Sequence, residues 1–223
     1  MTKELLVKAL AKLLLGAVIM GALLFVAAGS LQYWNGWVLL GALFVPMSIV
    51  GATLLFREPE LLQKRLNSRE TDSQQRVVVA ANALLFILVF VVSGLGWRLG
   101  WYMFPRWMVW VALILFLAAY LMYAEVLREN SYLSRTIEVR QEQKVIDTGL
   151  YGIVRHPMYT SSIVLFVMMP VILGSPVATA AMLLYIPLII MRIKLEEKLL
   201  DRELKGYIEY KRKVRYRLFP FIW

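Results

Sequence analysis

The sequence predicts an all-α integral membrane protein with about six transmembrane helices, the last two forming a tight hairpin. The first observation is composition, because a chain with 60% hydrophobic residues and a positive mean hydropathy is too apolar for an ordinary soluble domain. The second is the length of the apolar runs, since a membrane-spanning helix needs about 20 mostly apolar residues. The third is an alternation of basic residues between the connecting segments.

Four apolar runs are long enough to span a membrane, and they are Leu5–Ala28, Trp34–Phe56, Val77–Leu95 and Phe104–Leu127. A fifth stretch, from Met158 to Leu195, is long enough for two spans. Gly174-Ser175-Pro176 interrupts this stretch near its middle. We therefore expect spans five and six to form a helical hairpin with a short tip.

The basic residues test this arrangement. Leu31–Gly36 and the Gly-Ser-Pro tip contain no Lys or Arg, and Gly96–Trp107 contains two. In contrast, Arg57–Arg76 and Arg128–Arg155 contain five each, and ten follow from Arg192 to the end. Cytoplasmic connections are the basic ones. The pattern therefore predicts six spans, with both termini and the polar segments on the cytoplasmic side.

The connecting segments predict two further short helices. Arg57–Arg76 mixes charges of both signs and is expected to form a short amphipathic helix at the membrane surface. A second short amphipathic helix is expected after span six, on the cytoplasmic face. We interpret residues 1–223 as a single membrane domain, in which residues 1–127 hold four spans and residues 128–223 hold the functional region.

Composition also excludes several function classes. The net charge of +10 does not indicate nucleic acid, because the basic residues are confined to short segments between apolar runs. The absence of cysteine excludes disulfides, thiolate metal sites and cysteine nucleophiles, and a single histidine does not favour a zinc site, so no metal is expected. The sequence also lacks a phosphate-binding loop, a complete dinucleotide fingerprint and a Gly-x-Ser-x-Gly elbow.

Two polar clusters remain as candidates for chemistry. Asp147–Tyr159 contains the only histidine, and Pro157 fits the first turn of a helix, so His156 is predicted as its cap residue. The second cluster, Arg192 to Glu197, lies where span six emerges. Because a tight hairpin returns to the face that it left, the two clusters should lie close together in space.

The chemistry of the clusters favours a zwitterionic small molecule. The N-terminal turn of a helix that begins at Pro157 suits a carboxylate or phosphate. Glu196 suits a cationic or hydroxyl-bearing group, and the rings of Tyr151 and Tyr159 suit a cation. Arg192 and Glu196 are four residues apart on one helix face, within reach of a salt bridge.

The motifs in these clusters resemble a known family. Thr148-Gly149-Leu150-Tyr151-x-x-x-Arg155-His156-Pro157-Met158-Tyr159, then Glu196-Glu197-x-x-Leu200 and Tyr207-x-x-Tyr210, are similar to the isoprenylcysteine carboxyl methyltransferase family and related membrane phospholipid methyltransferases. The resemblance covers roughly Asn130 to Trp223. It implies an enzyme that binds S-adenosylmethionine between its C-terminal helices and methylates a lipid-like acceptor from the bilayer.

The resemblance also implies roles for individual residues. Cofactor contacts are expected from Gln143, Lys144, Val145, Ile146, Tyr151, His156, Pro157, Met158, Tyr159 and Glu196. Arg192 is expected to orient the acceptor substrate. A carboxylate acceptor of the isoprenylcysteine type needs no general base, whereas a phospholipid amine must lose a proton, for which Glu197 or His156 would be the candidates. A membrane sterol or enone reductase that uses NADPH is the alternative, since its C-terminal region has a similar layout.

Overall fold

The computed structural model describes residues 2–67, 73–130, 132 and 143–223, which form helices and no strand. This confirms the predicted all-α class for the described residues. The elements are α1 (Thr2–Ala28), α2 (Trp34–Arg57), α3 (Pro59–Asn67), α4 (Ser73–Arg98), α5 (Arg106–Glu129), η1 (Gly149–Gly152), α6 (Pro157–Ile172), α7 (Pro176–Met182), α8 (Tyr185–Glu203) and α9 (Tyr207–Lys213).

Within the described residues, five helical stretches are long and apolar enough to cross a membrane. They are Lys3–Ala28, Trp34–Arg57, Arg76–Arg98, Arg106–Glu129 and Pro176–Glu203. The first four contain most of each of the four predicted apolar runs, which supports an integral membrane protein. Helix α6 is apolar but has 16 residues, fewer than the roughly 20 that cross a bilayer. This helix corresponds to predicted span five, so the predicted count of six spans depends on it.

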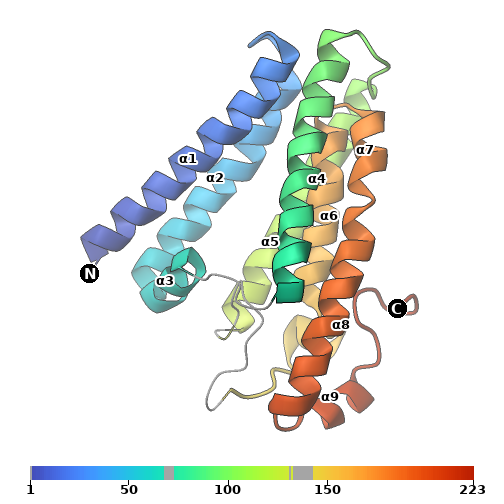
Figure 1. Ribbon diagram of the computed structural model, residues 1–223. Helices are drawn as coiled ribbons and strands as arrows, with labels where there is room; N and C mark the ends of the chain where they lie inside the picture. Colours follow the sequence, from blue (N-terminus) through green and yellow to red (C-terminus); the bar gives the residue numbers. More distant parts are fainter. Residues whose placement is uncertain (1, 68–72, 131, 133–142) are drawn as a thin grey trace.

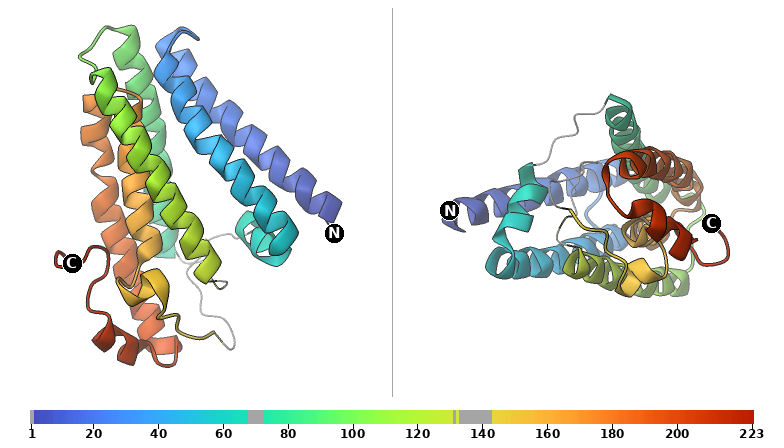
Figure 2. Two further views of the ribbon diagram at one scale, coloured as in Figure 1. Left: turned by 180° about the vertical axis from the view of Figure 1, so that it is seen from behind. Right: turned by 90° about the horizontal axis from the view of Figure 1, so that it is seen from below.

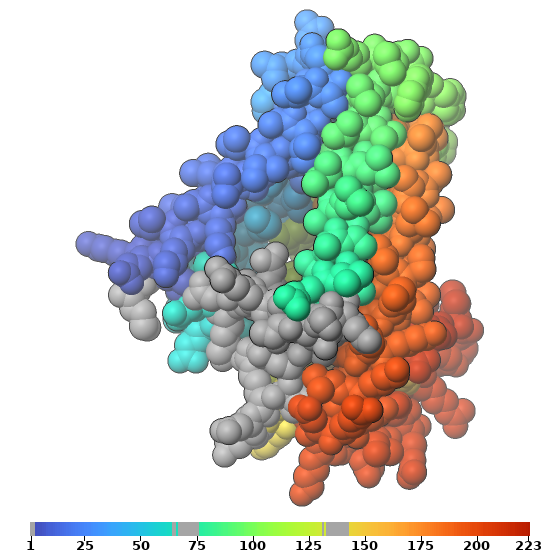
Figure 3. All heavy atoms as spheres, in the orientation of Figure 1, coloured from blue at the N-terminus to red at the C-terminus, as the bar shows by residue number. Residues whose placement is uncertain are grey.

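The helices are arranged so that one end of the molecule gathers the polar segments. Figures 1 and 2 show α4 to α8 as a bundle, with α1 and α2 leaning away from it toward the N-terminus. On the face in Figure 3, α1 and α4 meet along their upper parts. Both termini, α3 and α9 lie toward the same end, opposite the α1–α2, α4–α5 and α6–α7 connections. The side of the membrane that this end faces stays a prediction.

A short helix does occur in the segment predicted to form one between spans two and three. Helix α3 begins at Pro59, directly after α2 ends, and runs to Asn67. Residues 68–72 of the predicted segment lie outside the described part of the chain.

The turn between α6 and α7 falls at the predicted interruption. Gly174 has φ +75°, in the left-handed region that favours glycine, and the Ser175 hydroxyl accepts a hydrogen bond from the Ala178 N–H at 3.3 Å. Two buried side chains near the start of α2 donate hydrogen bonds to backbone carbonyls at this turn. Tyr33 donates to the Leu173 carbonyl at 2.5 Å, and Asn35 donates to the Ile172 carbonyl at 2.7 Å.

The segment predicted as span six is not one continuous helix. Helix α7 ends at Met182 and α8 begins at Tyr185, with a turn between them. Pro187 explains the break, because proline has no N–H to donate and its ring clashes with the carbonyl four residues earlier, that of Leu183. The Leu183 carbonyl accepts from the Ile186 N–H instead, at 3.1 Å. The sixth predicted span is thus two helices.

Aromatic packing fixes the helices that carry the functional clusters. Phe166 of α6 meets Phe86 of α4 edge to face, with ring centroids 4.8 Å apart, and meets Tyr185 of α8 in the same way at 5.0 Å. Such pairs stabilise a packing arrangement beyond the area that they bury. The positions of α6 and α8 relative to each other are therefore set well inside the bundle.

Candidate active site

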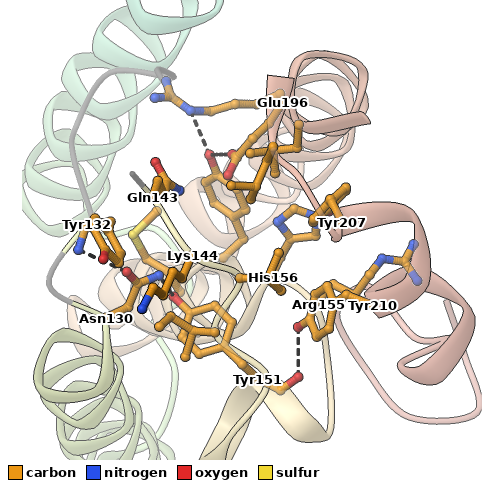
Figure 4. A pocket seen from close by; sticks show the side chains of 17 residues that line it. Asn130, Tyr132, Gln143, Lys144, Tyr151, Arg155, His156, Glu196, Tyr207 and Tyr210 are labelled. Carbon is orange, nitrogen blue, oxygen red and sulfur yellow. Dashed lines mark hydrogen bonds between the residues drawn. The ribbon is translucent and has the colours of Figure 1, made fainter. Parts of the chain in front are cut away.

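An open pocket lies at the end of the bundle that carries η1 and α9. It encloses about 860 Å³ of empty space when its open mouth is included. Figure 4 shows the side chains that converge on it. They are Asn130, Tyr132, Gln143, Lys144, Val145, Ile146, Tyr151, Arg155, His156, Met158, Tyr159, Arg192, Glu196, Leu200, Leu204, Tyr207 and Tyr210.

The pocket brings the two predicted clusters together. All of the predicted site residues line it except Pro157 and Glu197. Pro157 is buried at the start of α6. Glu197 is buried one residue beyond the pocket-lining Glu196. The hairpin therefore does place Asp147–Tyr159 beside the end of α8, as predicted.

A tyrosine from α6 links the arginine and the glutamate that α8 contributes. The Tyr159 hydroxyl donates to Glu196 Oε2 at 2.5 Å, and Arg192 Nε donates to the same hydroxyl at 3.1 Å. Arg192 and Glu196, which are four residues apart on α8, are thus connected through the Tyr159 hydroxyl of α6. This wall of the pocket offers a carboxylate and a guanidinium to a ligand.

Glu197 has a different environment from Glu196. Its Oε1 accepts from Arg155 Nε at 2.8 Å and lies 3.2 Å from His156 Nε2. Its Oε2 accepts from Arg217 Nε at 2.8 Å. Glu197 and Arg155 are 4% and 7% exposed. Both oxygens of Glu197 therefore accept hydrogen bonds within the protein, and its role as a general base stays a prediction.

The same arginine fastens the C-terminal segment beneath the pocket. Arg155 Nη1 donates to the carbonyls of Val214 at 2.8 Å and Arg215 at 2.7 Å. The backbone N–H groups of Arg155 and His156 donate to the carbonyls of the next two residues of the segment, each at 2.9 Å. The turn before α6, the end of α8 and the C-terminal segment are therefore joined through one buried ion pair.

His156 caps α6 with its main chain. It is the N-cap residue with Pro157 in the first turn, which confirms the predicted helix start. Its side chain makes no capping hydrogen bond. Its carbonyl accepts from the N–H groups of Tyr159 and Thr160 at 3.0 and 3.1 Å. The imidazole instead lines the pocket, beside the Tyr159 ring and Glu197.

Another part of the pocket lining is aromatic and aliphatic, and it comes largely from α9 and the residues next to it. Leu204, Tyr207, Tyr210 and Val214 form a small buried cluster, against which Val145 and Leu200 pack. The Tyr210 hydroxyl donates to the Tyr151 carbonyl at 2.7 Å. Burial raises the pKa of both Tyr207 and Tyr210 well above the ordinary value of a phenol. Both hydroxyls are therefore protonated donors at neutral pH.

A glycine turn and an ion pair position α9 and the segment before η1. Gly206, at the start of α9, has φ +87°, so a glycine allows the sharp turn from α8 into α9. At the other end, Lys213 Nζ lies 2.7 Å from Asp147 Oδ2. This hydrogen bond lowers the pKa of the Asp147 carboxyl below its ordinary value. The contact is exposed and adds little to stability.

Several pocket residues were not predicted from sequence. Leu200 and Leu204 follow Glu196 at intervals of four, so the helical period could have placed them on the same face. Tyr207 and Tyr210 belong to a motif that the resemblance includes without a role. Asn130 donates to the Tyr151 hydroxyl at 3.0 Å, a contact that no local pattern indicates.

Gly149 is the tightest point of the η1 turn and yields a stability prediction. Its φ is +50°, and a Cβ at this position would collide with the Glu129 carboxylate, which accepts from the Leu150 N–H at 3.1 Å. We expect Gly149→Ala to lower the free energy of unfolding by about 1–3 kcal/mol, measured by thermal unfolding in detergent micelles.

The control for this prediction is Gly41→Ala. No heavy atom lies within 4 Å of a Cβ at Gly41, and alanine is favoured over glycine inside a helix. This variant should therefore unfold at or above the wild-type temperature. A Gly149→Ala protein as stable as the wild type would contradict the described geometry of the turn.

Fold and site together describe an integral membrane protein with a small-molecule pocket at one end of its helical bundle. Residues 110–202 match the model of the isoprenylcysteine carboxyl methyltransferase (ICMT) family. The match covers both polar clusters and confirms the resemblance to this family that the motifs indicate. A comparison with curated proteins gives no match.

Proposed function

We propose that this protein is an S-adenosylmethionine-dependent methyltransferase that acts on a hydrophobic acceptor with an isoprenylcysteine-type carboxylate. The observation that carries the proposal is the pocket of the ICMT-like region, whose lining combines charged side chains on α8 with aromatic ones on α6 and α9. Acceptors of this kind partition into the bilayer, and the pocket is lined by residues near the start of the apolar helix α6 and the end of α8.

The residues of the pocket fit the groups of the proposed methyl donor. Its ammonium and ribose hydroxyls suit the Glu196 carboxylate, and its carboxylate suits the amide of Gln143 and the ammonium of Lys144. The faces of Tyr151 and Tyr159 suit a sulfonium cation. The aliphatic and aromatic wall on α9 suits an adenine ring. The donor set is thus complete for a zwitterion attached to a nucleoside.

The bound donor would supply an electrophilic methyl group on its sulfonium. The chain then needs to hold the acceptor in line and to exclude water, and neither task requires a metal or a covalent intermediate. Arg192 is the residue placed to orient an acceptor carboxylate, because a guanidinium binds carboxylates with directional hydrogen bonds. A carboxylate is already ionised at neutral pH, so the acceptor can react without a general base.

The occupied state of Glu197 favours a carboxylate acceptor over a phospholipid amine. An amine must lose a proton before or during methylation, and both oxygens of Glu197 already accept hydrogen bonds from basic side chains. The reductase alternative also loses support. Arg155, one of the cations considered for nucleotide phosphates, binds Glu197 and the carbonyls of the C-terminal segment.

We also propose that the pocket end of the molecule faces the cytoplasm. Helices α3 and α9 lie toward that end. The sequence segments Arg57–Arg76, Arg128–Arg155 and the chain after Arg192 carry most of the basic residues. Basic connections remain on the cytoplasmic side during insertion. The pocket would then face the compartment that supplies the methyl donor.

A pair of calorimetric titrations tests the proposed cofactor. Protein purified in detergent is titrated with S-adenosylmethionine and, separately, with NADPH. The proposal predicts saturable binding of S-adenosylmethionine, with a dissociation constant on the order of the micromolar values usual for enzymes and their substrates, and no binding of NADPH. Binding of NADPH alone, or of neither compound, would overturn it.

Arg192 provides a prediction about the acceptor. We expect Arg192→Ala to lower turnover by about 10- to 100-fold, because the acceptor carboxylate loses a charge-assisted hydrogen bond and its orientation. Affinity for S-adenosylmethionine should change by only a few fold, as measured by calorimetry.

Arg192→Lys serves as the matched control for this prediction. It keeps the charge but not the planar fork, so we expect an intermediate turnover. If the alanine variant loses methyl donor binding and turnover together, Arg192 belongs to the donor site and the assigned role is wrong.

A further inference from the structure

The buried hydroxyl of Tyr207 has no hydrogen-bond partner among the residues that the structure describes. The side chain is 4% exposed and lines the pocket. Figure 4 shows it on the same side of the pocket as His156 and Tyr210. The other tyrosine of the motif, Tyr210, donates to a main-chain carbonyl. One hydroxyl of the pair thus serves the fold, and the other is left for a ligand.

An unpaired buried hydroxyl needs an explanation, because nearly all buried polar groups in folded proteins form hydrogen bonds. The charges of the Glu197 and Glu196 carboxylates both act on the Tyr207 hydroxyl. Both oxygens of Glu197 accept from other residues, and Glu196 Oε2 accepts from Tyr159. A bound ligand that offers an acceptor to the Tyr207 hydroxyl would remove the free-energy cost of burying this hydroxyl without a hydrogen bond.

The surroundings of Tyr207 indicate which part of a ligand it meets. The buried cluster around it consists of Leu204, Tyr210 and Val214, with Val145 and Leu200 packed alongside. This apolar wall suits a flat heterocycle, whereas the carboxylate of Glu196 on α8 suits the ammonium of the amino-acid part. The left-handed turn at Gly206 directly precedes α9, which carries Tyr207 and Tyr210.

We propose that the Tyr207 hydroxyl donates a hydrogen bond to the nucleoside half of the methyl donor. Helix α9 then recognises the nucleoside, and α8 recognises the amino acid. Tyr207 is in this sense a specificity-determining residue of the pocket. The inference rests on the proposed function, since it takes the ligand to be a nucleoside-bearing methyl donor.

The test compares Tyr207→Phe with two other tyrosine substitutions in detergent-purified protein. Affinity is measured by calorimetry for S-adenosylhomocysteine and by competition for 5′-methylthioadenosine, which lacks the amino-acid part. Thermal unfolding is measured without ligand. Tyr210→Phe reports the loss of a hydroxyl that serves the fold. Tyr216→Phe reports the loss of a hydroxyl outside the pocket lining.

Tyr207→Phe is expected to weaken binding of both compounds by about 3- to 10-fold, the factor that corresponds to one neutral hydrogen bond. Its unfolding temperature without ligand should equal or exceed that of the wild type, because no internal hydrogen bond is lost. Tyr210→Phe should unfold at a lower temperature, since it loses the bond to Tyr151. Tyr216→Phe should leave both affinities unchanged.

Five results would overturn the inference, and they are distinguishable from one another. Unchanged affinity of Tyr207→Phe for both compounds would show that the Tyr207 hydroxyl does not contact the ligand, and it would leave the proposed function unaffected. Weakened binding of S-adenosylhomocysteine alone, or no competition by 5′-methylthioadenosine in the wild type, would refute the assignment to the nucleoside half. An unfolding temperature lowered as in Tyr210→Phe would give Tyr207 a structural role. A wild type that binds neither compound would overturn the proposed function as well.

Discussion

Replacing Glu197 with alanine is expected to lower the free energy of unfolding by about 3–5 kcal/mol, the largest stability effect of any substitution considered. The reason is that Arg155, only 7% exposed, would keep its buried charge and lose the carboxylate that pairs with it. The ties to His156 and Arg217 would be lost in the same step. Thermal and chemical unfolding in detergent micelles measure the change.

Two companion variants make the Glu197 prediction specific. Glu197→Gln keeps the shape and one acceptor oxygen but removes the charge, so its loss of stability should be intermediate. Arg217→Ala should be milder than either, because the Arg217 side chain is 31% exposed and ion pairs near water are screened. A Glu197→Ala protein with wild-type stability and abolished turnover would instead give Glu197 a catalytic role.

Replacing the adjacent Glu196 with alanine is expected to have the largest effect on ligand binding. Affinity for S-adenosylmethionine should fall by about 10- to 100-fold, the range for a hydrogen bond to a charged group. Stability without ligand should change little, because Glu196 faces the pocket and its contact within the protein is the Tyr159 hydroxyl. Calorimetry and thermal unfolding of the same preparation give both quantities.

Glu196→Gln is the matched control for the binding prediction, since it keeps hydrogen-bonding capacity and loses the charge. A retained affinity in this variant would show that Glu196 binds ligand hydroxyls and not the ammonium. If Glu196→Ala loses stability while its affinity is unchanged, the pocket assignment of the two glutamates is reversed.

Much of the fold follows from the apolar runs and the basic connections. The runs that begin at Leu5, Trp34 and Val77 correspond to α1, α2 and α4, because long uninterrupted apolar helices are the most direct signal in a sequence. The meeting of the two clusters also follows, since a hairpin brings its two ends to one face. The break before α8 was missed although Pro187 indicates it.

The roles of the paired glutamates were harder to predict from the motif. Adjacent residues on a helix point about 100° apart, so one motif can serve two purposes. A signal was present, because Tyr185, Ile189, Ile193 and Glu197 recur every four residues and are all buried. This stripe places Glu197 against the bundle. The binding of Arg155 to the C-terminal segment had no such signal, since it joins residues about 60 positions apart.

The most direct test of the proposed activity is transfer of a labelled methyl group. Protein in lipid vesicles is incubated with S-adenosylmethionine that carries a radiolabelled methyl and with an S-prenylated cysteine derivative that has a free carboxylate. The predicted result is label in the organic extract that mild base releases as methanol, the behaviour of a methyl ester, and much less label with Arg192→Ala. An extract without label, or base-stable label on a phospholipid amine, would contradict the proposed function.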